Sequence, residues 1–205
     1  MVGPEQHAIR DYYTRELQPQ RLSIELAIQE EPKGTADAVA AAETFAAGDP
    51  FVSINSDNYY PLEAYRALRE QDGPAVALFE KDAMVRGSNV PTERLDKFAV
   101  GEIDERGFVK RIIEKPDSRT WAALPRPLWM SMNCWRFGPT IFQACRSIGP
   151  SSRGEYEITS AVQYAMDVLG ESFRAVLIHS PVLDLSSRED IAPVAAKLAD
   201  TEVNL

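Results

Sequence analysis

Cysteine is scarce in this sequence, which contains only Cys134 and Cys145. Two cysteines are too few for a disulfide framework, and neither has a histidine or a second cysteine at the spacing of zinc ligands. We therefore expect both thiols to be reduced and structural. The two histidines, His7 and His179, are most simply read as surface or packing residues.

Long apolar runs and a basic leader are also missing. No stretch approaches the roughly 20 apolar residues that cross a bilayer. The opening residues, MVGPEQHAIR, do not place an apolar segment after a basic one, as a secretory signal does. The sequence therefore predicts no contact with a membrane and a cytoplasmic location.

Positive charge is in short supply as well. Lysine and arginine number 22 against 31 aspartate and glutamate residues, so the formal net charge is −9. A negative field of this kind repels a polyphosphate backbone, which argues against nucleic acid as a partner. A phosphorylated small molecule can bind only where a local cation or a metal ion offsets that field.

The remaining composition is that of an ordinary globular protein. The chain has 205 residues, of which 44% are hydrophobic and 26% are charged. This length is enough to bury a sizeable core, and the sequence has neither internal repeats nor low-complexity segments. We therefore expect a single domain over residues 1–205.

Helical and strand patterns alternate over the first eighty residues. The clearest helix is rich in alanine, and the clearest strand alternates apolar with polar residues. The expected elements are helix 5–17, strand 21–29, helix 34–49, strand 51–55, helix 61–71 and strand 74–80. Such an alternation predicts parallel pairing in an α/β sheet.

The pattern changes after residue 98. Residues 98–116 contain two strand-like runs around the turn Asp104–Gly107, which predicts a β-hairpin. The later elements are strand 129–137, helices 139–148 and 155–170, strands 173–178 and 181–185, and helix 188–200.

Two helix starts have a readable signature. Ser152 and Glu155 fit the S-x-x-E capping box, in which a hydroxyl and a carboxylate satisfy backbone donors reciprocally. Ser187 and Asp190 form a looser variant of the same pattern.

One acid, Asp57, stands where the strand in FVSINSDNYY ends. A carboxylate at the carboxyl edge of a sheet is well placed to hold a metal ion, because ligand crevices of open α/β sheets form there. Aspartate also closes strands by hydrogen-bonding its own backbone. On this segment alone the turn is the favoured interpretation.

The segment from Gln29 to Thr35 passes from a strand end through Gly34 into a helix. A glycine turn exposes backbone donors and lets a flat ring approach without meeting a Cβ atom. A plain strand-to-helix turn explains the same residues.

Glu114 and Lys115 end the hairpin just before Pro116. Adjacent residues on a strand point to opposite faces, so we expect Pro116 to bend the chain until both charges serve one cleft. Lysine is a usual point-charge ligand of phosphate. The alternative is a solvated pair, because long charged side chains are mostly exposed.

A second acid, Asp184, lies among apolar neighbours in PVLDLSS. A buried and unpaired carboxylate is costly, so Asp184 should cap a helix, accept hydrogen bonds or bind a cation. Convergence of Asp57 and Asp184 on Mg²⁺, which prefers oxygen ligands and retained waters, would explain both acids.

Six segments in register carry a resemblance to a known family. They are QEEPKGTADAVAAA, FVSINSDNYYP, FVKRIIEKP, SMNCWRF, GEYEIT and VLDLSSREDI. Together they resemble the sugar-1-phosphate nucleotidyltransferases, which include thymidylyl-, guanylyl- and uridylyltransferases. The resemblance covers nearly the whole chain and implies a Rossmann-like (GT-A type) α/β fold. Its sheet would be mixed but mainly parallel, with helices on both faces.

The resemblance also implies a reaction and a role for each candidate residue. A sugar 1-phosphate would attack the α-phosphorus of a nucleoside triphosphate and release pyrophosphate, with Mg²⁺ as cofactor and no protein nucleophile. The implied catalytic residues are Asp57 and Asp184, which would hold the metal, and Lys115, which would grip the sugar phosphate. The resemblance assigns the nucleotide to Gln29, Gly34 and Thr35, and the sugar to Glu114, Asn133 and Glu155.

One part of the family pattern is missing. The family opens with a strand, a glycine-rich G-x-G-T-R-x-x-P loop and a K-P pair, whereas this sequence resembles the family only from the end of its second strand. Preorganised charges of this kind are the main source of rate in such chemistry. We therefore expect an N-terminally truncated chain with little activity alone, assembled as a homo-oligomer or completed by an N-terminal segment.

Two other functions stay open. A non-catalytic relative that binds nucleotide or sugar phosphate and regulates a partner fits the missing loop, although Asp57, Lys115 and Asp184 argue against it. A glycosyltransferase of the same fold could use Asp57 for a metal. The EKP run and the absent second acid of a D-x-D motif count against that function.

Overall fold

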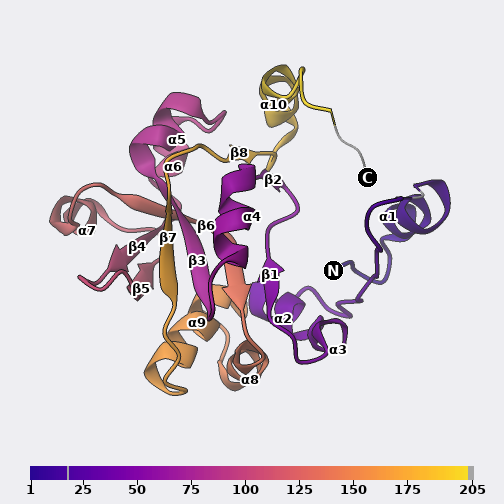
Figure 1. The fold of residues 1–205 in the computed structure, drawn as a ribbon, viewed down its shortest axis with the longest axis horizontal. Coiled ribbons are helices and arrows are strands. Elements are labelled where there is room, and N and C mark those ends of the chain that lie inside the picture. The colour runs from indigo at the N-terminus through magenta and orange to yellow at the C-terminus, as the bar shows by residue number, and fades with distance from the viewer. Residues whose placement is uncertain (18, 203–205) are drawn as a thin grey trace. The chain divides into compact units, whose positions relative to one another are not determined.

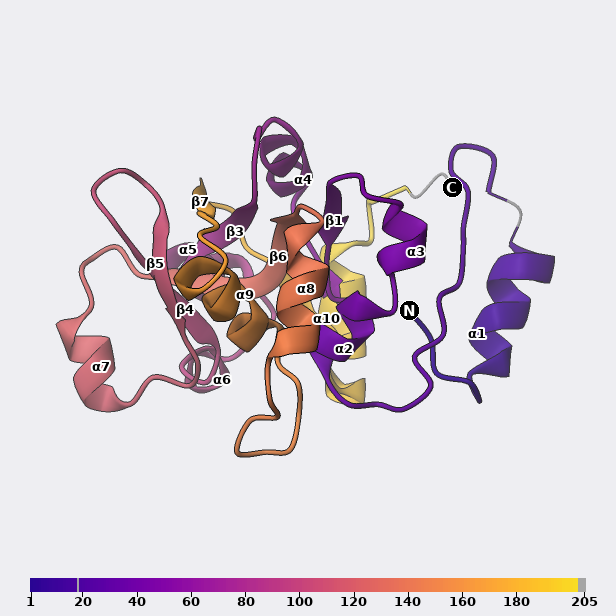
Figure 2. The same ribbon diagram turned by 90° about the horizontal axis from the view of Figure 1, so that it is seen from below.

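The computed structural model describes residues 1–17 and 19–202, and its ribbon is drawn in Figures 1 and 2. The chain divides into two compact units. Unit 1 consists of Met1–Asp49, Pro139–Leu169 and the residues from Asp200 onward, and unit 2 consists of Pro50–Gly138 and Gly170–Ala199. The six-stranded sheet lies in unit 2.

Unit 1 is built from short helices. They are α1 (His7–Asp11), the π-helical segment η1 (Tyr12–Glu16), α2 (Thr35–Ala40), α3 (Glu43–Ala46), α8 (Thr140–Ser147) and α9 (Ile158–Asp167). Helices α2, α8 and α9 pack against one another. Their small and apolar residues, Ala36, Phe142 and Ala161 among them, are buried.

The amino-terminal helix is confirmed, but its apolar stripe is not buried. Helix α1 and η1 cover most of residues 5–17. Ile9, Tyr12 and Tyr13 are all exposed, and the rings of Tyr12 and Tyr13 contact each other edge to face.

The predicted strand 21–29 is wrong. Its only ladder contact among the described residues is a single parallel bridge between Val2 and Ile28. Val2 N donates to Ala27 O at 3.0 Å, and Gln29 N donates to Val2 O at 2.9 Å. Apolar alternation gives a segment one apolar face, but a strand also needs a partner along its length.

The alanine-rich segment forms two helices instead of the single predicted one. Helix α2 ends at Ala40, α3 begins at Glu43, and Ala47 then takes a left-handed conformation with φ of 50°. The helical prediction for 34–49 is thus right in type and wrong in continuity.

Unit 2 contains the central sheet. Its strands are β1 (Phe51–Ser53), β3 (Ala75–Glu80), β4 (Ala99–Ile103), β5 (Val109–Ile113), β6 (Trp129–Phe137) and β7 (Arg174–Ile178). The order is β5-β4-β6-β3-β7, and β1 also pairs with β6. Strand β6 is long enough to pair with three neighbours, and it is almost wholly buried.

The strand directions agree with the predicted mixed α/β sheet. Strand β6 is antiparallel to β1, β3 and β4, β5 is antiparallel to β4, and β7 is parallel to β3. Strands β1, β3, β4 and β7 therefore run one way, and β5 and β6 run the other way. Most strands share a direction, but parallel pairing, which the alternation of the first eighty residues predicted, occurs within the described part of this sheet only between β3 and β7.

The hairpin expected over 98–116 is confirmed by β4 and β5. At its turn, Asp104 Oδ1 accepts hydrogen bonds from Arg106 N at 2.9 Å and Phe108 N at 2.8 Å, and Gly107 has φ of 82°. Helix α7 (Ser118–Ala123) lies near the hairpin in both ribbon views (Figures 1 and 2).

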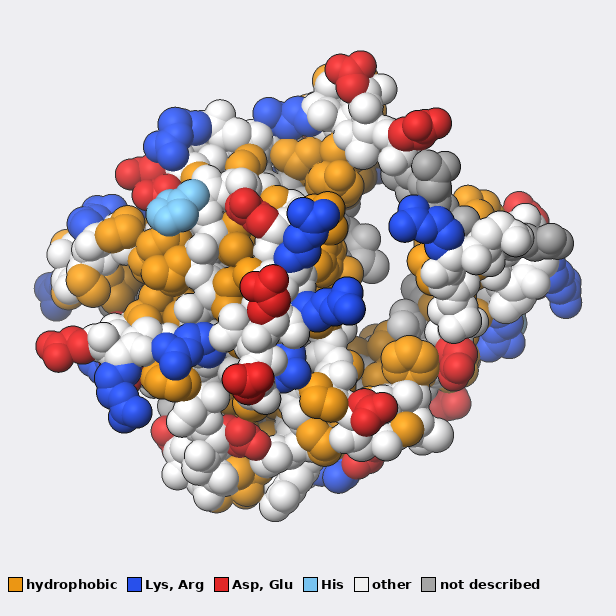
Figure 3. All heavy atoms as spheres, in the orientation of Figure 1, with side chains coloured by type: hydrophobic (Ala, Val, Ile, Leu, Met, Phe, Trp, Pro, Cys, Tyr) orange, Lys and Arg blue, Asp and Glu red, His pale blue; other side chains and the backbone are white. Residues whose placement is uncertain are grey.

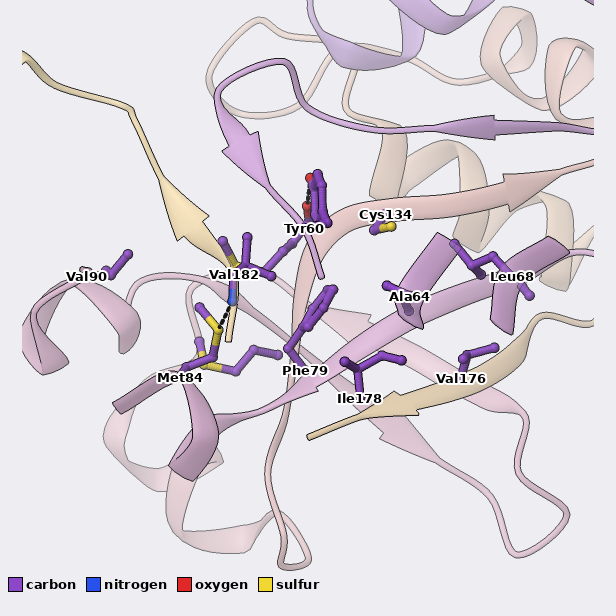
Figure 4. Close-up of a cluster of buried hydrophobic side chains, with 14 of the residues drawn as sticks. Tyr60, Ala64, Leu68, Phe79, Met84, Val90, Cys134, Val176, Ile178 and Val182 are labelled. Carbon is purple, nitrogen blue, oxygen red and sulfur yellow. Dashed lines mark hydrogen bonds between the residues drawn. The ribbon is translucent and has the colours of Figure 1, made fainter. Parts of the chain in front are cut away.

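Shorter elements complete unit 2. They are α4 (Leu62–Arg69), α5 (Lys81–Gly87), α6 (Thr92–Leu95), the 3₁₀ turn η2 (Arg188–Asp190), α10 (Ile191–Lys197), and the ladder of β2 (Asn58–Tyr59) with β8 (Leu183–Asp184). Helix α4 packs on the sheet through Ala64 and Leu68, which join Phe79 and Ile178 in one buried cluster (Figure 4). Full burial of a side chain such as Leu68 contributes about 1.5–3 kcal/mol.

Both cysteines are free and buried, as predicted. Burial raises the pKa of Cys134 and of Cys145 to about 12, so both are protonated thiols at neutral pH. Among the described residues, no helix is long and apolar enough to cross a bilayer. Acidic and basic side chains are interspersed over the face drawn in Figure 3.

Candidate functional site

The short ladder of β2 with β8 joins the two acidic segments, which are far apart in the chain. Asn58 pairs with Asp184, and Leu185 N donates to Asp57 O at 2.8 Å. Neighbouring residues of an extended chain point to opposite sides. Accordingly Asn58 and Asp184 share one side, where their side chains hydrogen-bond, while Asp57 is exposed.

The carboxylate of Asp184 is buried and fully engaged. Its Oδ1 accepts hydrogen bonds from Asn58 Nδ2 at 2.8 Å and from Ser186 Oγ at 2.8 Å. Its Oδ2 accepts one from Arg94 Nη2 at 2.7 Å. The side chain is only 4% exposed. This confirms the expectation that a buried carboxylate needs partners, and the charged partner is an arginine.

The same arginine also holds Asp190. Arg94 Nη1 donates to Asp190 Oδ2 at 3.2 Å, and Arg94 Nη2 donates to Oδ1 at 3.1 Å. Asp190 Oδ2 accepts further hydrogen bonds from Ser187 N and Ser187 Oγ, which forms the predicted capping box of η2. Hydrogen bonds from Arg94, opposed by burial, and then from Ser187 hold the pKa of Asp190 below its usual range.

This arrangement does not fit a Mg²⁺ ion as it stands. Within the described residues, no three His, Cys, Asp or Glu side chains are grouped as a metal site. Asp184 has three partners already, and one of them, Arg94, carries the positive charge that a cation would bring. The predicted metal role of Asp57 with Asp184 therefore stays a prediction, and no chemical step below depends on it.

Two candidate residues of unit 2 have an unusual backbone. Lys115 has φ of 44° and Asn133 has φ of 55°, which is the left-handed region that side chains with a Cβ rarely adopt. Asn133 lies at a bulge of β6, where the pairing with β3 jumps from Cys134 to Ser131. Strain and bulges of this kind gather at functional sites, so they favour a role for both residues.

The surroundings hold this part of the chain in place. Tyr60 Oη donates to Met132 O at 2.5 Å, beside Asn133, whose Oδ1 accepts a hydrogen bond from Trp135 Nε1 at 3.4 Å. At the other position, Glu114 and Lys115 are exposed while Pro116 is buried. Pro116 thus anchors a bend that leaves both charged groups accessible.

The nucleotide candidates of unit 1 are packed against the segment that contains Glu155. Tyr156 N donates to Lys33 O at 2.8 Å, and Ala36 N donates to Tyr156 O at 2.8 Å. A Cβ atom on Gly34, whose φ is 125°, would lie 2.5 Å from Tyr156 O. The glycine is therefore required by this backbone contact, whereas its sequence had suggested space for a flat ring.

Thr35 and Gln29 also make internal hydrogen bonds. Thr35 Oγ1 accepts one from Ile158 N, the first residue of α9, at 2.9 Å. Gln29 Nε2 donates to Gly34 O at 3.1 Å and to Asp37 Oδ2 at 2.8 Å. The three nucleotide candidates thus lie together in one turn, and a ligand would have to share or exchange these contacts.

The capping box predicted for Ser152 and Glu155 is wrong. Helix α9 begins at Ile158, and residues 151–155 form a turn in which Gly154 N donates to Ser151 O at 2.8 Å. The acceptor at the start of the helix is the hydroxyl of Thr35, a residue distant in sequence. Glu155 is exposed, so its predicted sugar-binding role is sterically open.

Sequence reasoning missed Arg94 and Asn89. Asn89 Oδ1 accepts a hydrogen bond from Asp184 N at 2.9 Å, and Asn89 Nδ2 donates to Asp184 O at 2.7 Å. The one available signal was indirect: a buried acid at 184 implies an unidentified partner. No local pattern distinguishes Arg94 from the other arginines on exposed helices.

Comparison with known proteins decides the family. A profile described as nucleotidyl transferase matches residues 2–178. The chain belongs to this family. Its relatives include a low-salt glycan biosynthesis nucleotidyltransferase of Haloferax volcanii, 30% identical over 71% of this chain, and a glucose-1-phosphate thymidylyltransferase of Streptomyces griseus, 29% identical over 88%. The chain spans only 37% and 47% of those two proteins.

A third relative and two solved structures agree. The UTP–glucose-1-phosphate uridylyltransferase AglF of Haloferax volcanii is 28% identical over 93% of this chain and 72% of its own length. A UDP-glucose pyrophosphorylase crystallised with UDP-glucose has a TM-score of 0.70 over 98% of this chain and 81% of its own, at 18% identity. A putative glucose-1-phosphate thymidylyltransferase of Bacillus anthracis reaches 0.72 over 100% and 77%, at 19% identity. These structures confirm the predicted fold of this chain.

Proposed function

We propose that this chain catalyses the formation of a nucleotide sugar from a sugar 1-phosphate and a nucleoside triphosphate. The observation that carries the proposal is the β2–β8 ladder, which brings the Asp57 segment against Asp184 across more than a hundred residues of sequence. A nucleoside triphosphate substrate also suits the cytoplasmic location inferred from the sequence.

In the proposed reaction, a phosphate oxygen of the sugar 1-phosphate attacks the α-phosphorus of the triphosphate. A new P–O bond forms, the bond to the β-phosphate breaks, and pyrophosphate leaves. The contribution of the protein is positioning and charge neutralisation. Lys115 is accessible and would hold the phosphate of the sugar as a point charge.

Other residues would position the two substrates. The residues proposed to bind the sugar are Glu114, Asn133 and Glu155. Gln29, Gly34 and Thr35 are proposed to bind the nucleotide. Mg²⁺ remains the proposed cofactor, and exposed Asp57 is the acid able to reach an ion that arrives with the triphosphate.

A further strand is proposed to complete the sheet. Within the described part of the chain, the strand ladder of β1 is with β6 alone; Val52 in β1 and Ile54, just after its end, are 40% and 44% exposed. An unpaired edge with apolar side chains is a template for strand addition. We therefore expect low turnover by the present chain, increased by a segment or a second copy that adds a strand to β1.

A substrate screen with one matched variant pair tests the proposal. Sugar 1-phosphates are combined with the four common triphosphates, and nucleotide-sugar binding is measured by calorimetry alongside pyrophosphate release. We expect K115A to lower kcat/KM by about 100-fold, or to weaken binding where turnover is too slow to measure. K110A is the control, because Lys110 is also exposed but is paired with Glu102 on the hairpin. Equal effects of the two variants, or no binding of any nucleotide sugar, would refute the proposed function.

A further inference from the structure

Arg94 is the only cation among the described residues that contacts Asp184, and its position is set by two acids. The guanidinium contacts Asp190 through both Nη atoms, at 3.1 and 3.2 Å, and Asp184 through Nη2 at 2.7 Å. Such a two-pronged contact fixes the plane of the group. The side chain of Arg94 is 31% exposed, whereas those of Asp184 and Asp190 are 4% and 7% exposed.

We propose that Arg94 is the resident counter-ion of Asp184, so that a divalent cation can bind Asp184 only after the guanidinium has moved away. The inference rests on the proposed function in one respect, the assignment of Asp184 as the second acid of the transfer site. In this proposal Arg94 is a positioning residue that acts through Asp184.

The hydrogen-bond capacity of Asp184 is the first argument. A carboxylate offers about four acceptor positions. Asn58 and Ser186 share Oδ1, and Arg94 takes one position on Oδ2. The remaining position lies on the oxygen that already faces the guanidinium. A Mg²⁺ ion there would need an octahedral shell with several waters, right beside a fixed positive charge.

Burial and anchoring are the second argument. A hydrated ion does not reach a carboxylate that is 4% exposed unless a neighbour moves. Asp190 resists that movement, because Ser187 N at 2.9 Å and Ser187 Oγ at 2.8 Å hold its Oδ2 in place. Arg94 is thus held from the far side by a second acid that has no role in the proposed reaction. A lone surface pair would lack this anchor.

A metal-binding experiment without any substrate tests the proposal. Mn²⁺ serves as the probe and is titrated into the full chain, with free ion measured by electron paramagnetic resonance. In the wild-type chain, D184N should leave the titration unchanged. The double variant R94Q/D190N, which removes one positive and one negative charge together, should bind Mn²⁺ at least about ten-fold more tightly. Adding D184N to that double variant should abolish the gain.

Two controls separate the counter-ion from general effects. R86Q removes an exposed arginine of α5 whose nearest acid, Glu80, is 3.8 Å away, and it should not change Mn²⁺ affinity. R94K keeps the charge but loses the planar fork, so it should give a smaller gain than R94Q/D190N. If the double variant does not fold by circular dichroism, the comparison of wild type with D184N still tests the proposal.

The proposal is overturned if D184N weakens Mn²⁺ binding by the wild-type chain. It is also overturned if folded R94Q/D190N binds Mn²⁺ no better than wild type. Because no nucleotide or sugar is present, these outcomes are independent of turnover. The substrate screen could fail while R94Q/D190N binds Mn²⁺ more tightly than wild type. That combination would refute the proposed function but support the counter-ion role of Arg94.

Discussion

Backbone conformations with positive φ are informative at the scale of single residues. Side chains with a Cβ pay roughly 1–2 kcal/mol in this region, yet Lys115 and Asn133 adopt it. Both lie beside a buried anchor, Pro116 in one case and the contact of Tyr60 with Met132 O in the other. The surrounding structure therefore holds Lys115 and Asn133, both assigned to the proposed reaction, in backbone conformations that are unfavourable in isolation.

Gly34 gives a direct test of a residue-scale argument. We expect G34A to lower the free energy of unfolding by about 3 kcal/mol, because its φ of 125° excludes a Cβ and the new atom would lie 2.5 Å from Tyr156 O. G48A is the matched control, since Gly48 also has positive φ, 88°, but nothing within 4 Å of the added atom. It should cost about 1 kcal/mol. The free energy of unfolding of both variants is measured by urea unfolding. Equal decreases in G34A and G48A would contradict the close contact between residue 34 and Tyr156.

At the scale of elements, several starts and ends depend on contacts from elsewhere in the chain. Helix α9 has no side-chain cap from its own flank, and the acceptor for its first amide is Thr35 Oγ1. The S-x-x-E pattern at 152–155 is a local signal for a helix start. No helix starts there, because the turn at Ser151–Gly154 directs the chain against residues 33–36.

The role of Thr35 can be tested by two substitutions of similar size. T35V removes the acceptor, so we expect the free energy of unfolding to fall by about 1 kcal/mol, the usual contribution of a helix cap. T35S keeps a hydroxyl and should retain most of that stability. The measurement is amide hydrogen exchange at Ile158, which should become faster in T35V alone. Unchanged protection of that amide in T35V would show that the cap is unimportant in solution.

Elements set by local pattern were predictable, and those set by remote partners were not. The runs that became α4, β3, β6 and the β4–β5 hairpin carry enough apolar periodicity to be read directly. Residues 21–29 have the same periodicity but only Val2 as a described partner, so no strand forms. Asp184 was predictable as a site because a buried acid needs a reason, whereas Arg94 and the β2–β8 pairing arise from distant segments.

At the scale of the whole molecule, burial of thiols makes stability depend on alkaline pH. Cys134 and Cys145 lie in different units, and burial raises the pKa of each to about 12. An unfolded thiol has a pKa of about 8.5. Below that pH both states keep the proton, so the contribution to stability is complete. Above it the unfolded chain loses the proton while the folded chain keeps it, so folding becomes less favourable as pH rises toward 12.

The expected loss is about 1.4 kcal/mol per pH unit for each thiol between those limits. We therefore expect the free energy of unfolding of the wild-type chain to fall between pH 8 and pH 10. In C134A or C145A, which each lack one thiol, this decrease should be smaller by about 2 kcal/mol. Each variant also loses packing, but that loss is the same at both pH values and cancels in the difference. Urea titrations at the two pH values make the comparison. Parallel pH profiles for wild type and both variants would mean that the thiols are not buried in solution as they are in this structure.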